Sequence, residues 1–156
     1  MRVLRTTAAT LLILAVAGGA AAAGRSSAHA APLSHTCSLA DKHFIQSARL
    51  SMFSVGSWSD DYLRGEAKAS EVIAQADNAV LAMRNTQPED PTLRRASLVL
   101  RAMFGEYADA VAADAHGHRP GRHIYRAYGL ANFAHDLLVQ ARPALERHGC
   151  DVSPLL

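Results

Sequence analysis

The sequence predicts an all-α fold: an up-down-up-down four-helix bundle closed by one disulfide. Apolar residues recur at three- and four-residue steps through most of the chain, and no stretch alternates as a strand would. Two cysteines, Cys37 and Cys150, lie near the two ends of the helical region. An even number of antiparallel helices brings these ends together, whereas an odd number separates them by about 30 Å for 20-residue helices. Pattern and cysteine placement therefore favour four helices.

Residues 1–30 have the three parts of a cleavable signal peptide. Arg2 and Arg5 form a basic start, and residues 11–17 form an apolar run. The small residues around His29 predict cleavage after Ala30, with the alanines at 21–23 as an alternative site. The apolar run is shorter than the roughly 20 residues that a membrane helix needs. We therefore expect a secreted or extracytoplasmic protein in which a disulfide can persist.

Removal of residues 1–30 takes away three arginines and no acid. Thirteen basic residues then face fourteen acidic ones, for a formal charge of −1. This balance gives no sign of nucleic-acid binding, and membrane contact is expected only through the signal peptide during export. The remaining length suits one domain. The abundance of alanine and arginine is typical of a bacterial source with a GC-rich genome.

Helix starts are marked by local capping patterns within the predicted bundle domain, residues 37–150. A short polar lead, residues 31–36, precedes it. Ser38 is expected to cap the first helix, with Asp41 as the acidic partner of a capping box. Asp90-Pro91 after a polar turn predicts an N-cap followed by proline at the first helical position of the third helix.

The boundary between the first and second helices has two solutions. Gly56 followed by serine predicts a break there, which places Asp60 and Asp61 in the first turn of the second helix, where the dipole favours acids. Alternatively, the first helix continues and the break falls at Gly65. The sequence leaves this choice open.

The last helix follows a glycine- and proline-containing loop. Pro143 is expected to kink its final turns, and Gly149 to terminate it. Residues 151–156 then form a C-terminal tail.

Three histidines in the loop before the last helix are the candidate metal ligands. Topology places this loop at the same end of the bundle as the junction of the first two helices. His116, His118 and His123, with a carboxylate from Asp60, Asp61 or Asp114, would suit Zn²⁺ or Cu²⁺. The spacing matches no established zinc motif, and exposed loop histidines without any metal are the alternative.

Arginines at the start of the last helix suggest a second kind of site. Arg119, Arg122 and Arg126 stand where the helix dipole disfavours cations, so an anion is expected to offset them. A bound phosphate, sulfate or carboxylate would do so. Asp60 and Asp61 from the neighbouring loop would serve equally well, and this structural explanation is preferred.

No catalytic motif is present, since the chain contains no phosphate-binding glycine loop, Gly-x-Ser-x-Gly or His-Glu-x-x-His. We therefore expect an exported, non-catalytic binding or interaction module whose partner the sequence does not identify. A metal-binding protein that uses the histidine loop is the first alternative. The second is an enzyme with an unfamiliar site among Trp58 and the tyrosines at the same end of the bundle.

Overall fold

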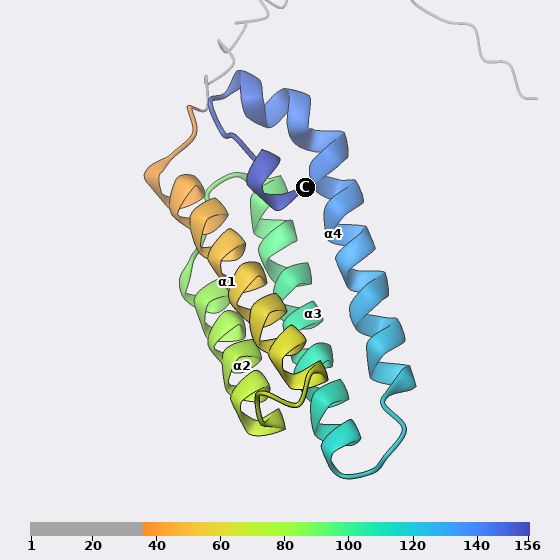
Figure 1. Cartoon of the computed structure of the whole chain (residues 1–156). Helices are drawn as coiled ribbons and strands as arrows, with labels where there is room; N and C mark the ends of the chain where they lie inside the picture. The colour runs from red at the N-terminus through yellow and green to blue at the C-terminus, as the bar shows by residue number, and fades with distance from the viewer. Residues whose placement is uncertain (1–35) are drawn as a thin grey trace, which may run out of the picture. The chain divides into compact units, whose positions relative to one another are not determined.

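The computed structural model describes residues 36–156, which form four antiparallel α-helices and a short C-terminal 3₁₀ helix (Figure 1). The predicted signal peptide, its cleavage site and most of the polar lead lie outside the described residues. The elements are α1 Leu39–Leu63, α2 Ala69–Asn85, α3 Pro91–Ala115, α4 Gly121–Arg147 and η1 Ser153–Leu155. The predicted all-α, four-helix fold is confirmed.

Each helix packs mainly against the next one in the chain. Helix α2 contacts α1 and α3, and α4 packs along α3, whereas no Cα atom of α1 lies within 8 Å of one in α4. The outer helices are joined instead at their far ends. Cys37 and Cys150 form a disulfide with Cα atoms 5.0 Å apart, as the even helix count predicts. The bundle is therefore closed by the disulfide at one end, whereas helices α1 and α4 do not pack directly against each other.

The predicted break at Gly56 is wrong, and the alternative at Gly65 is correct. Helix α1 continues through Gly56 to Leu63, and Gly65 in the following turn has a φ of 75°. A glycine inside a helix costs only about 1 kcal/mol, which continued packing of the apolar face can offset. Asp60 and Asp61 consequently lie in the last turns of α1 and not at the start of α2.

Both predicted helix caps form. The Ser38 hydroxyl accepts a hydrogen bond from the Asp41 N–H at 3.1 Å, and the Asp41 carboxylate accepts one from the Ser38 N–H at 3.2 Å. At the start of α3, the Asp90 carboxylate accepts from the N–H groups of Thr92 and Leu93, at 2.7 and 3.1 Å. These caps satisfy N–H groups that have no partner inside the helix.

The buried Asp41 carboxylate also ties α1 to the start of α3. Its Oδ1 accepts from the backbone N–H groups of Glu89 and Asp90, at 2.8 and 2.9 Å. Burial alone would raise the pKa of Asp41, but the hydrogen bonds from Asp90, Ser38 and Glu89 outweigh it and the net pKa is lowered. A single ionised side chain therefore holds two helix starts together.

The core runs between the helices and reaches the disulfide end. Its largest fully buried side chains come from all four helices and from the C-terminal segment: Phe44, Val72, Leu93, Phe104, Leu138, Cys150 and Val152. One buried polar group is satisfied across the α2–α3 pair, because the Ser97 hydroxyl donates to the Met83 carbonyl at 2.9 Å. No helix among residues 36–156 is long and apolar enough to cross a membrane.

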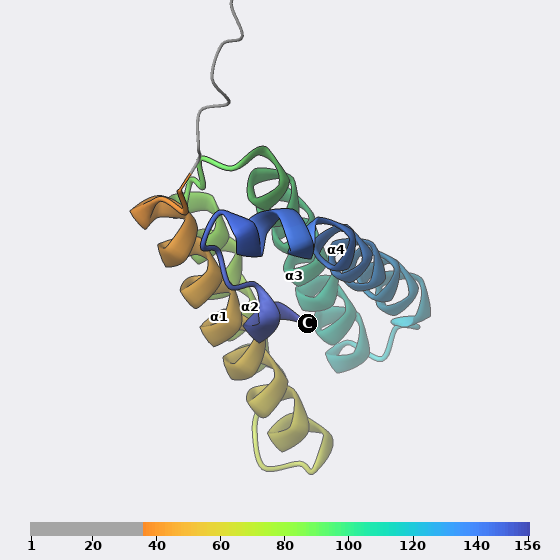
Figure 2. The same ribbon diagram turned by 90° about the horizontal axis from the view of Figure 1, so that it is seen from above.

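The C-terminal segment packs between α1 and α4 near the disulfide. Helix α4 bends in its last turns, which contain Pro143, and Gly149 reverses the chain with a φ of 81° (Figures 1 and 2). Val152 and Leu155 are buried, and η1 contacts both α1 and α4. The tail beyond Cys150 is thus part of the core and fills the gap between the outer helices at this end.

Candidate functional site

Beyond η1, the gap between α1 and α4 is an open groove of about 480 Å³. Its floor is α3, and its two walls are α1 and α4. The lining residues are Met52, Val55, Gly56, Ser59 and Asp60 from α1, Met103, Phe104 and Tyr107 from α3, and Ile124, Ala127, Tyr128 and Ala131 from α4. The groove exists because α1 and α4 do not pack on each other where η1 does not fill the space.

The groove is apolar along most of its length. Phe104 at its floor is buried, while Met52 and Met103 are half-buried and can adjust to the shape of a guest. Its inner end approaches η1, because Met52 and Met103 also border a small cavity of about 50 Å³ beside Leu155. The apolar side chains present a preformed surface to a hydrophobic molecule.

Polar groups are confined mainly to the distal part of the groove. Ser59 donates its hydroxyl proton to the Val55 carbonyl, while Asp60 is exposed. Nearby, the Tyr62 hydroxyl donates to the Asp114 carboxylate at 2.7 Å, and this hydrogen bond raises the pKa of Tyr62. The contact joins the end of α1 to the end of α3 and so holds the distal part of the α1 wall.

The α4 wall exposes large apolar side chains. Ile124 and Tyr128 are 51% and 67% exposed although both line the groove, and Tyr125 beside them is 80% exposed. Single exposed apolar residues are ordinary, but several that flank one apolar groove indicate a surface suited to binding.

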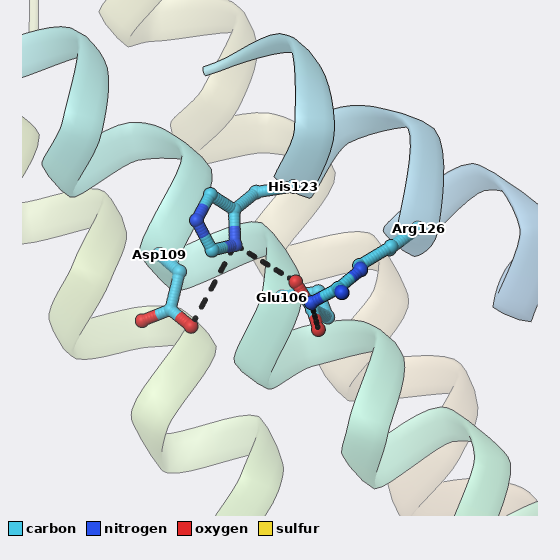
Figure 3. A network of polar contacts seen from close by, with 4 residues as sticks. All are labelled: Glu106, Asp109, His123 and Arg126. Atoms are coloured by element: carbon cyan, nitrogen blue, oxygen red, sulfur yellow. Dashed lines mark hydrogen bonds and ion pairs between the residues drawn. The ribbon is translucent and has the colours of Figure 1, made fainter. Parts of the chain in front are cut away.

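A cluster of charged side chains lies between α3 and α4 (Figure 3). Glu106 and Asp109 come from α3, and His123 and Arg126 from α4. His123 Nδ1 lies 2.8 Å from Glu106 Oε2 and 3.9 Å from Asp109 Oδ2, and Arg126 Nη1 lies 3.3 Å from Glu106 Oε1. None of the four lines the groove. We call these residues the Glu106 cluster.

The Glu106 carboxylate is the shared partner in this cluster. The hydrogen bond from His123 lowers the pKa of Glu106 most; burial opposes this, and the positive charge of Arg126 adds to the lowering. Glu106 is therefore ionised near neutral pH and holds the first turns of α4 against α3 through both its oxygens.

The structure brings only one of the sequence-predicted metal ligands into a cluster. The rings of His116 and His118 stack with centroids 6.5 Å apart in an exposed turn, and His116 Nδ1 hydrogen-bonds to the Ala112 carbonyl at 2.6 Å. Asp61 pairs with Arg64. His123 instead meets Glu106 and Asp109.

Two groups among the described residues gather three metal-ligating atoms within 4.8 Å of one another. One contains Cys37, Asp41 and Cys150, and the disulfide removes its sulfurs as ligands. The other is formed by Glu106, Asp109 and His123.

The three arginines predicted as an anion site differ in their surroundings. Arg126 pairs with Glu106, and its counter-charge therefore comes from α3 and not from Asp60 or Asp61. Arg119 and Arg122 are exposed at the start of α4.

Sequence reasoning missed Glu106 and Asp109, although a usable signal was present. Glu106 and Asp109 are three residues apart on one helix, and His123 and Arg126 are three apart on the next. When the chain folds back at the intervening loop, these two pairs face each other with opposite charge.

No protein-family model, curated protein or solved structure matches the chain.

Proposed function

We propose that this protein is an exported, non-catalytic binding module that holds a small apolar or amphipathic molecule in the groove between α1 and α4. The observation that carries the proposal is the groove itself, an open hollow of about 480 Å³ between α1 and α4 whose lining is mainly apolar. Sites for small molecules typically measure about 300–1,000 Å³ and are lined by hydrophobic side chains with few polar groups.

The size of the groove matches a small molecule, because about 480 Å³ lies within the range of such sites. A ligand with an apolar body would contact Phe104 and the methionines, while a hydroxyl or cationic group would suit the distal end near Asp60.

Export is supported by two independent features. The first 30 residues have the basic, apolar and small-residue segments of a signal peptide. The Cys37–Cys150 disulfide suits an oxidising compartment outside the cytoplasm, because thiols in the bacterial cytoplasm are kept reduced.

Filling the groove tests the proposal. Gly56 lines the groove, and a Cβ added there meets no atom within 4 Å. Gly56→Leu should therefore place a side chain in the channel while improving helix propensity by about 1 kcal/mol. Binding of N-phenyl-1-naphthylamine, followed by its fluorescence, should be saturable in the unmodified protein. The variant should weaken it by at least about tenfold, which corresponds to about 1.4 kcal/mol.

Gly129→Leu is the matched control. Gly129 is also an uncrowded helical glycine, but it does not line the groove. This variant should bind the probe as the unmodified protein does. Equal weakening by both substitutions, or no saturable binding in the unmodified protein, would exclude the groove as the binding site.

A further inference from the structure

We propose that Glu106, Asp109 and His123 bind a divalent transition-metal ion of the zinc or copper class. Their ligand atoms already lie within 4.8 Å of one another. Zinc binds imidazole nitrogen and carboxylate oxygen at about 2.0–2.2 Å, so tetrahedral ligands stand about 3.4 Å apart. The three atoms are therefore already close to the spacing that a bound ion requires.

The directions of the side chains favour a common ion. Figure 3 shows His123 Nδ1 facing the carboxylates of both Glu106 and Asp109. At present, Nδ1 is 2.8 Å from Glu106 and 3.9 Å from Asp109. A metal ion takes the place of the Nδ1 proton: in a neutral ring this proton leaves to solvent while Nε2 takes up another from solvent, and in a protonated ring the Nδ1 proton is simply released. The imidazole then ligates as a neutral group.

Arg126 contacts the Glu106 carboxylate without facing the proposed ion itself. It holds Oε1 of Glu106 at 3.3 Å and leaves Oε2 to face His123. In metal sites, such hydrogen bonds to a ligating carboxylate fix its orientation. With neutral His123, the two carboxylates and Arg126 carry a net charge of −1, which attracts a dication.

The two helices position the ligands and leave one side open. The side chains of Glu106 and His123 are 23% and 32% exposed, and they are held at the packed α3–α4 contact. The side chain of Asp109 is 67% exposed, so water can complete the coordination from that side. One nitrogen and two carboxylate groups favour zinc or copper over magnesium, which prefers oxygen ligands and retains much of its water.

Calorimetric titration of the protein, purified without a histidine tag, with ZnCl₂ at about pH 7.5 tests the site, because an unperturbed imidazole is neutral there. We expect saturable uptake of one ion per chain and a rise in melting temperature with Zn²⁺, since a ligand that prefers the folded state stabilises it. His123→Ala should weaken affinity by more than the roughly 10–100-fold that loss of a residue hydrogen-bonded to a metal ligand costs. MgCl₂ at the same concentration should produce neither effect.

Two further variants separate this site from the histidine loop and from unfolding. Asp109→Asn removes a ligand whose side chain is largely exposed, so helicity by circular dichroism should be retained while zinc affinity falls. The double variant His116→Ala/His118→Ala should retain the full uptake. Absence of saturable uptake by the unmodified protein overturns the proposal. So does uptake that survives both His123→Ala and Asp109→Asn, or that disappears only in the loop variant.

Discussion

Replacement of Asp41 by alanine should destabilise the bundle far more than replacement of an ordinary surface acid. Loss of the capping box with Ser38 costs about 1 kcal/mol. The N–H groups of Glu89 and Asp90 also lose a charged acceptor, and each such hydrogen bond contributes about 1.5 kcal/mol or more. Asp41→Ala should therefore lower the free energy of unfolding by about 4 kcal/mol, a large part of the 5–15 kcal/mol typical of a domain.

The effect should depend on pH with a definite sign. Because the folded pKa of Asp41 is lowered, its stabilising contribution is complete above the unfolded pKa of about 4 and is lost as the pH falls through the folded value. The difference in the free energy of unfolding between the unmodified protein and Asp41→Ala should thus be smaller at about pH 3 than at pH 7.

Urea denaturation followed by circular dichroism at the two pH values measures this difference. Asp77→Ala is the control, because Asp77 is an exposed acid within α2, and its effect should stay within about 0.5 kcal/mol. A loss below about 1 kcal/mol for Asp41→Ala at pH 7 would refute the role given to the two N–H contacts. A difference that does not shrink in acid would refute the ionised state of the carboxylate.

Three other perturbations test the compartment, the covalent closure and the tail. N-terminal sequencing of exported protein should begin near Ala31, and a product that retains residues 1–23 would contradict cleavage. Reduction of the Cys37–Cys150 bridge, which spans a sequence separation of 113, should lower the free energy of unfolding by about 5 kcal/mol. An unchanged urea midpoint in reductant would contradict this. Leu155→Ala should lower the free energy of unfolding by about 2 kcal/mol, because the Leu155 side chain is buried. Leu156→Ala should lower it much less, because Leu156 is exposed. Equal melting temperatures of the two variants would show that the tail adds no packing.

The starts of α1 and α3 were predictable because their capping signals are local. Asp90 followed by Pro91, and Ser38 with Asp41, satisfy unpaired N–H groups within one turn, so no knowledge of the partner helices is needed. Gly149 similarly acts through its own backbone conformation. The disulfide was expected from two cysteines in an exported chain, and an even number of helices agreed with it.

The break at Gly56 was mispredicted because a helix interior depends on tertiary packing. Val55 on one side of this glycine is buried in the core, and its burial rewards continuation of the helix. Once α1 continues, Asp60 and Asp61 move from a helix start to a helix end, where Asp61 pairs with Arg64.

The candidate sites depend on geometry that the sequence does not state. His123 was recognised as a possible ligand, but its partners Glu106 and Asp109 depend on how α4 is set against α3. The groove was even harder to predict from the sequence. It exists because α1 and α4 do not pack on each other, although their apolar patterns resemble those of any helical bundle. Tyr107 and Tyr128 were noted as possible pocket residues, and both line the groove.

The separation of α1 from α4 also has a consequence for folding kinetics. Since each helix packs mainly against its sequence neighbour, most tertiary contacts join segments that are close along the chain. Chains of such low contact order fold rapidly, because little loop entropy is lost before contacts form. Cys37 and Cys150 are 113 positions apart in the sequence, so we expect assembly of the helical hairpins to bring them together. During oxidative folding, native disulfide formation therefore reports completion of the whole array, and the helical signal should precede it.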